Sequence, residues 1–157
     1  MLRGTLLTLH ILAVVVWLGA GLYDLFLSHE IRRQRGTPAE VTLARVYVRY
    51  GPVIVAAALV VAVTGALQSS LLGWGYFQHL WLGIKQALML VVLGCLAAVF
   101  PTFSRMGRAV ASLPESATEL GDEARALFAR AEPYILVMRT AALLAVVLAV
   151  FRPALGQ

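Results

Sequence analysis

Among the polar and aromatic side chains inside long apolar runs, five could do chemistry that aliphatic residues cannot: His10, Trp17, Asp24, Lys85 and Arg139. Ionisable groups are costly inside a bilayer and usually face a bundle interior or a cavity, so each is a candidate site residue. A neutral imidazole can ligate a metal, an amine can bind an anion, and an acid with a base can form an ion pair or a proton path. His10, Trp17 and Asp24 recur at intervals of seven, which places them on one stripe of a helix.

Depth along the helices brings His10 and Lys85 together. At about 1.5 Å per residue, each lies roughly 9–10 Å inside the end of its span, in the outer half of the membrane. Thr64 and Gln86 reach the same level. The simpler interpretations are a histidine hydrogen-bonded to a neighbouring helix and a lysine that extends to the interface. Taken together, the two residues predict a polar pocket that also includes Trp17.

Asp24 and Arg139 form a second group. Asp24 is near the cytoplasmic end of the first span, and Arg139 is about two turns into the last span, so their depths agree. We expect a structural ion pair that joins the first and last helices. A proton or anion path is the alternative.

The elements that must position these residues are membrane-spanning helices. Of the 157 residues, 61% are hydrophobic and 13% are charged, with a mean hydropathy of +0.84, which is too apolar for a water-soluble core. Crossing a hydrocarbon core takes roughly 20 helical residues, and four stretches qualify, at about 4–28, 50–72, 78–100 and 133–151. We therefore predict a single all-α transmembrane domain, an integral membrane four-helix bundle of two antiparallel hairpins.

Two connections carry helix-start signals. Thr37-Pro38-Ala39-Glu40 has the form of a capping box and predicts a helix that runs on into the second span, with a kink at Gly51-Pro52. Ser112-Leu113-Pro114-Glu115 repeats the signal. Leu120, Ala124, Leu127 and Phe128 follow on one face, which predicts a short amphipathic helix at the membrane surface over about 115–131.

Arginines are distributed unevenly between the two sides of the predicted bundle. The connections after the first and third spans hold Arg32, Arg33, Arg35, Arg45, Arg49, Arg105, Arg108, Arg125 and Arg130, whereas the opposite side has Arg3 and Arg152. The positive-inside rule therefore places both termini outside the cytoplasm, in a multi-pass protein of the inner (cytoplasmic) membrane. Because the basic residues flank apolar spans, we expect them to contact lipid headgroups, and no nucleic acid partner is expected.

Three segments resemble a known group of membrane proteins. The first span, from His10 through Trp17-Leu18-Gly19-Ala20-Gly21 to His29-Glu30, resembles the first helix of HemJ-type protoporphyrinogen oxidases and of the related CopD-like membrane proteins. Trp81-Leu82-Gly83-Ile84-Lys85 is similar to the start of their third helix, and Ala131-Glu132-Pro133 to the approach to their fourth. The resemblance covers most of the chain, in the same order.

The resemblance implies a haem b protein that oxidises protoporphyrinogen IX, with electrons passing to a membrane quinone or another carrier. His10 and Lys85 would be the catalytic residues, His10 would ligate the haem iron, and Trp17 and Lys85 would line the cofactor site. One departure stands out, because Gly83 occupies the position of a family histidine. It removes a polar group beside the expected site and opens space against the helix, which leaves either altered haem ligation or another use of the fold.

Two other functions stay open. One is a CopD-like transport or accessory protein, although Met89, Cys95 and Met106 are scattered rather than clustered as copper ligands would be. The other is a cofactor-free membrane scaffold, in which Gly19 and Gly21 form the dimer face of a homo-oligomer. The sequence has no nucleophile–base arrangement and no phosphate-binding glycine loop, so we exclude a hydrolase or a kinase.

Overall fold

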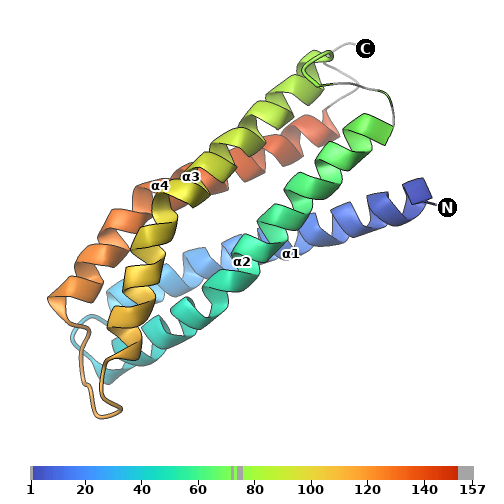
Figure 1. Cartoon of the computed structure of the whole chain (residues 1–157). Helices are drawn as coiled ribbons and strands as arrows, with labels where there is room; N and C mark the ends of the chain where they lie inside the picture. The colour runs from blue at the N-terminus through green and yellow to red at the C-terminus, as the bar shows by residue number, and fades with distance from the viewer. Residues whose placement is uncertain (1, 72, 74–75, 152–157) are drawn as a thin grey trace.

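Four long helices make up the described part of the chain (Figure 1). The computed structural model describes residues 2–71, 73 and 76–151, so the expected contribution of Arg152 lies outside it. The helices are α1 (Leu2–Arg33), α2 (Pro38–Leu71), α3 (Leu80–Ala111) and α4 (Asp122–Val150). Each is long and apolar enough to cross a membrane. The predicted all-α four-helix architecture is confirmed.

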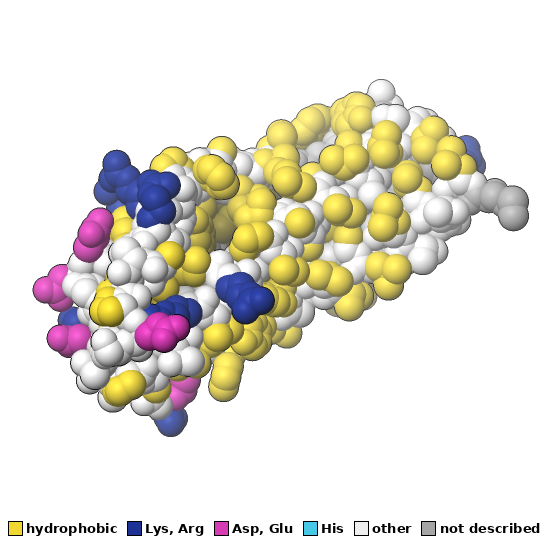
Figure 2. Space-filling model, turned by 60° about the horizontal axis from the view of Figure 1, so that its bottom comes forward, with side chains coloured by type: hydrophobic (Ala, Val, Ile, Leu, Met, Phe, Trp, Pro, Cys, Tyr) yellow, Lys and Arg dark blue, Asp and Glu magenta, His cyan; other side chains and the backbone are white. Residues whose placement is uncertain are grey.

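The helices form two antiparallel hairpins. α1 packs along α2, α3 packs along α4, and a smaller interface between α2 and α3 joins the pairs. Connections 34–37 and 112–121 lie at the same end of the molecule (Figure 1), which we call the polar end. Most of the charged side chains in view gather at this end, while the side chains coloured along the rest of the visible face are mostly apolar (Figure 2). This distribution fits a protein whose long sides face lipid.

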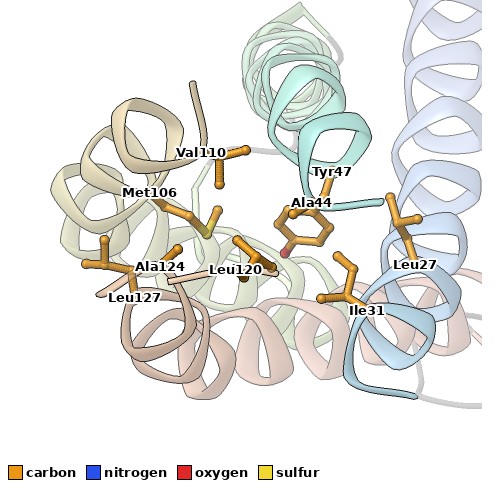
Figure 3. Close-up of a cluster of buried hydrophobic side chains, with 9 residues drawn as sticks. All are labelled: Leu27, Ile31, Ala44, Tyr47, Met106, Val110, Leu120, Ala124 and Leu127. Atoms are coloured by element: carbon orange, nitrogen blue, oxygen red, sulfur yellow. The ribbon is translucent and has the colours of Figure 1, made fainter. Parts of the chain in front are cut away.

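The hydrophobic core is concentrated at the polar end. Side chains from all four helices and from the 112–121 connection meet there (Figure 3). The cluster contains Leu27, Ile31, Ala44, Tyr47, Met106, Val110, Leu120, Ala124 and Leu127. Each helix has 29–34 residues, more than the roughly 20 that cross a bilayer core. The extra turns build this cluster and fasten the two hairpins together.

The helix ends differ from the sequence-based expectation. Thr37 and Glu40 do not form the expected capping box, because the Thr37 hydroxyl donates to the Gln34 carbonyl and the Glu40 carboxylate accepts from the Gly36 N–H. α2 does begin at Pro38 and continues through Pro52 as one helix.

No separate amphipathic helix forms over 115–131. Residues 112–121 are not helical, Ser112 is the C-cap of α3, and the residues from Asp122 onward are the first turns of α4. The apolar face expected there exists, but Leu120, Ala124 and Leu127 use it to pack in the polar-end core. Burial against three other helices outweighs adsorption to the membrane surface.

Candidate functional site

A large cavity lies between the two hairpins, and we call it the seam cavity. Its volume is about 1030 Å³, and all four helices contribute to its mostly apolar lining. The residues used below are Trp17, Gly21 and Asp24 of α1, Tyr47 and Tyr50 of α2, Leu93, Leu96 and Ala97 of α3, and Met138 and Arg139 of α4. Gly21 helps to keep this space open, because a Cβ added to it would meet no atom within 4 Å.

The Asp24–Arg139 ion pair lies at the wall of this cavity. The Arg139 guanidinium donates from Nη2 to the Asp24 carboxylate, so α1 and α4 are joined as their depths had suggested. Asp24 is 6% exposed, and the buried hydroxyl of Tyr47 reaches the same carboxylate. A carboxylate buried in apolar surroundings needs such partners, because their absence would leave an uncompensated charge.

The Nε–H of Arg139 takes no part in this network. Its Nε–H is buried and has no hydrogen-bond acceptor among the described residues. A buried donor without an acceptor costs about 1–3 kcal/mol. Buried polar groups are rarely left in this state, and such a group is often explained by a water or a ligand.

A second, smaller cavity of about 530 Å³ lies at the polar end. It is lined by charged residues, including Arg35, Glu40 and Arg125. Tyr47 and Arg139 line both cavities. The ion pair therefore lies where the mostly apolar seam cavity meets the more polar cavity at the polar end.

His10 lies elsewhere, between α1 and α2. Its Nδ1 is 2.8 Å from the Thr64 hydroxyl oxygen, and its ring packs against Gly65, where an added Cβ would be 3.3 Å from His10 Cε1. The Thr64 hydroxyl itself donates to the Val60 carbonyl at 2.6 Å. With its proton used, the Thr64 oxygen must accept from His10 Nδ1–H, a proton assignment inferred from the network. The structure thus brings together His10 and Thr64 of the expected pocket, and Lys85 lies within range of an electrostatic interaction with His10.

Lys85 and Gln86 lie near the N-terminal end of α3. The Lys85 ammonium is 5.9 Å from the centre of the Trp81 ring, within the range of a cation–π contact. Gln86 accepts from the Phe77 N–H at 2.8 Å and donates to the Ser69 hydroxyl at 3.4 Å. It therefore holds the turn before α3 instead of contributing to a pocket with His10.

Gly83 does not leave an open space. A Cβ at this position would lie 3.5 Å from Cα and Cδ1 of Phe77. Phe77 has a positive φ of 58°, which is uncommon for a bulky residue. The expected gap beside Lys85 is therefore occupied by the strained turn at Phe77, which Gln86 anchors.

Of the residues expected at a cofactor site, Trp17 lines the seam cavity, whereas His10 and Lys85 line neither described cavity. Sequence reasoning missed Tyr47 and Tyr50, which line the cavity from α2. They lie at or before the expected start of the second span, at residue 50. Residues three apart on a helix share a face, and this spacing of the two tyrosines was the sequence signal that could have identified them.

Comparison with known proteins gives a family and no further relative. Residues 4–153 match the family model DUF2269, described as a predicted integral membrane protein. The chain belongs to this family. No curated protein and no solved structure matches it. The family and the four apolar helices together establish a multi-pass integral membrane protein, and its family description specifies no ligand or reaction.

Proposed function

We propose that this protein binds a bulky, largely apolar molecule inside the membrane, in the seam cavity. The observation that carries the proposal is the cavity itself, with a volume of about 1030 Å³ and apolar walls from four helices. Small-molecule sites typically measure roughly 300–1,000 Å³ and combine apolar walls with a few polar groups. Here the polar groups are Asp24, Tyr47 and Arg139, gathered at one place.

The architecture supports this proposal. The hairpins are fastened at the polar end by the core cluster, and along their length they share a smaller interface than the helices within each hairpin do. Small residues face the cavity from both hairpins, Gly21 from α1 and Ala97 from α3. The seam cavity therefore has space for a ligand, and the packed core at the polar end holds the two hairpins at the separation that keeps the cavity open.

Filling the cavity from both sides tests the proposal. Gly21→Phe/Ala97→Phe places a ring in it from each hairpin, and Gly19→Phe/Ala98→Phe adds the same bulk at exposed positions outside it. Native mass spectrometry of protein purified in mild detergent should show small-molecule adducts on the wild type and the control, with several-fold lower occupancy on the filled variant. Equal occupancy on all three proteins, or none after exposure to membrane lipid extract, would reject the proposal.

Haem-dependent redox chemistry is a second candidate function, and the hydrogen bond of His10 supports it. The Val60–Thr64–His10 chain favours the tautomer that carries its proton on Nδ1, which puts the lone pair on Nε2. A metal-ligating histidine usually has this form, with its other ring nitrogen donating to a neighbouring acceptor. Bound through His10, haem b would supply one-electron chemistry, with a protoporphyrinogen-type porphyrin as substrate and a membrane quinone as acceptor.

A visible absorption spectrum tests this second function. Oxidised and dithionite-reduced protein should show a Soret band and reduced α and β bands that are lost or shifted in His10→Ala and altered in Lys85→Ala. A preparation that stays colourless after reconstitution with haemin would reject haem binding. It would leave the binding proposal intact, because that proposal rests on the seam cavity, which His10 does not line.

We also infer the orientation in the membrane. The helix ends that flank the 34–37 and 112–121 connections are rich in arginine and lie together at the polar end (Figure 2), and the positive-inside rule assigns that end to the cytoplasm. In the inner membrane, both termini would then lie on the outer side.

A further inference from the structure

The smaller cavity, at the polar end, indicates what kind of lipophile the seam cavity accepts. Resting on the binding function proposed above, we propose that the ligand is an anionic phospholipid, with its phosphate beside Arg35 in the polar-end cavity and its hydrocarbon chains in the seam cavity. The two cavities have volumes of about 530 and 1030 Å³, and Tyr47 and Arg139 line both. A ligand that occupies both must be polar at one end and apolar at the other.

Depth in the membrane is the first argument. At about 1.5 Å per residue, Asp24 lies about 33 Å along α1 from its start at Leu2, which is close to the thickness of a hydrocarbon core. Arg32, which lines the polar-end cavity, lies about 12 Å further along the same helix. The seam cavity is therefore at the level of acyl chains, and the polar-end cavity is at the level of lipid phosphates.

Charge is the second argument. Three arginines of the polar-end cavity are paired with acidic side chains: Arg32 with Glu132, Arg125 with Glu40, and Arg139 with Asp24. Asp122, a further acidic residue of the wall, lies 3.6 Å from Arg125. Arg35 also lines this cavity, and its exposed side chain forms no ion pair with any residue that the structure describes. An anionic group in the cavity would neutralise Arg35, whereas a second cation would be repelled.

The arginine chemistry favours a phosphate. Arg32 lies in the last turn of α1 and lines the same cavity as Arg35. Its ion pair with Glu132 joins side chains that are 55% and 54% exposed, and such exposed pairs contribute little to stability. A ligand can therefore share the Arg32 guanidinium with Glu132 at small cost. Guanidinium groups bind phosphate through paired hydrogen bonds, and the several oxygens of a phosphate can accept from Arg32 and Arg35 together.

Two phospholipids with the same chains test the role of charge. Dioleoylphosphatidylglycerol is anionic, and dioleoylphosphatidylcholine has no net charge. Native mass spectrometry of the wild type, titrated with each lipid in mild detergent, should show about threefold higher affinity for phosphatidylglycerol, as expected for one exposed ion pair. Gly21→Phe/Ala97→Phe, which fills the seam cavity, should weaken the binding of both lipids several-fold.

Arg35→Gln tests the headgroup site itself. The preference for phosphatidylglycerol should fall to about one in this variant. Arg33→Gln is the matched control, because it removes the same charge from a neighbouring side chain that is 70% exposed and lines neither described cavity. This control should keep the preference of the wild type. A preference that both variants lower equally would reflect general surface charge and would overturn the inference.

Two further probes separate a lipid from other ligands. sn-Glycerol 3-phosphate has the phosphate without the chains, and a large excess of it should leave the occupancy by phosphatidylglycerol unchanged. Displacement of the lipid would assign the polar-end cavity to a soluble phosphate and overturn the inference. Dodecanophenone is an uncharged lipophile and should bind equally to the wild type and to Arg35→Gln. Weaker binding to Arg35→Gln would mean that this residue acts through the shape of the seam cavity, which would also overturn the inference.

The outcomes distinguish this inference from the binding function beneath it. Equal affinity of the wild type for the two phospholipids, with both weakened in Gly21→Phe/Ala97→Phe, overturns the anionic phospholipid and keeps the cavity function. Binding that Gly21→Phe/Ala97→Phe leaves unchanged for both phospholipids and for dodecanophenone overturns both proposals.

Discussion

Arg125 and Glu40, 85 residues apart, form a two-bonded ion pair between α4 and α2 at the polar end. Arg125 Nε donates to Oε1 of Glu40 at 3.0 Å, and Nη2 donates to Oε2 at 2.8 Å. The same carboxylate accepts from the N–H groups of Gly36 and Leu120. The buried Glu40 side chain of the first hairpin thus holds two parts of the second hairpin, the 112–121 connection and the start of α4.

Glu40→Gln should therefore destabilise the protein more than its small change in shape suggests. The amide cannot accept the full set of hydrogen bonds, and leaving a backbone N–H of Gly36 or Leu120 without its acceptor costs about 1–3 kcal/mol. The midpoint of thermal unfolding in detergent should fall. Glu123→Gln, which removes the same charge from an exposed position in the first turn of α4, is the control and should leave the midpoint unchanged. Equal midpoints for the two variants would show that Glu40 does not fasten the hairpins.

The Asp24–Arg139 pair should behave as a coupled unit. Asp24→Asn alone leaves the arginine charge buried without its counter-ion, at a cost on the order of 3 kcal/mol. Asp24→Leu/Arg139→Leu removes both charges and should recover most of the lost stability, because apolar replacements for a buried pair are often neutral. A double variant that is less stable than Asp24→Asn would show that the two residues act separately. The midpoint of thermal unfolding in the same detergent measures the stability of the single and the double variant.

Thr64 should control the tautomer of His10. In the wild type, nitrogen-15 spectra of the imidazole should show a protonated Nδ1 and an unprotonated Nε2, since the Thr64 oxygen accepts from Nδ1. Thr64→Val keeps the shape and removes the acceptor, so a second tautomer should appear. Thr42→Val is a matched control, because the exposed Thr42 hydroxyl donates to the Pro38 carbonyl of its own helix. Spectra of Thr64→Val identical to those of the wild type would contradict the assignment.

The inferred orientation predicts which side of the membrane each connection faces. In a Cys95→Ser background, Ser116→Cys places a thiol in the exposed connection at the polar end, and Gln78→Cys places one at the opposite end. A membrane-impermeant maleimide added to intact cells should label Gln78→Cys, and it should label Ser116→Cys only after permeabilisation. The reverse pattern would invert the orientation.

The sequence was sufficient to predict the number and class of helices, because four apolar runs of membrane-spanning length have no other stable solution in lipid. It was also sufficient to suggest that Asp24 and Arg139 meet, since depth along a helix depends only on residue count. Depth alone did not predict direction. Lys85 does lie within electrostatic range of His10, whereas Gln86 bonds to Phe77, because rotation about the helix axis decides which neighbour a side chain meets.

The seam cavity and the true length of the helices were beyond a sequence-based prediction. A cavity is the space that packing leaves, and it depends on the separation of two hairpins whose apolar faces look alike in sequence. The partner of Glu40 was equally beyond prediction, because the local sequence pattern around Glu40 is that of a helix-capping residue. Its partner Arg125 lies 85 positions later, and no local pattern connects them.

Photolabelling is the most direct test of the central claim, that the space between the hairpins is a binding site. Wild-type protein in nanodiscs would be labelled with a diazirine derivative of dodecylbenzene, with and without excess dodecanophenone as competitor, and the labelled residues identified by mass spectrometry. We predict labelling of cavity residues such as Leu93, Leu96 and Met138 that the competitor abolishes, and competitor-insensitive labelling of exposed residues outside the cavity such as Leu12 and Val15. Labelling that the competitor leaves unchanged at both sets of residues would mean that the probe samples only surrounding lipid, and would contradict the claim.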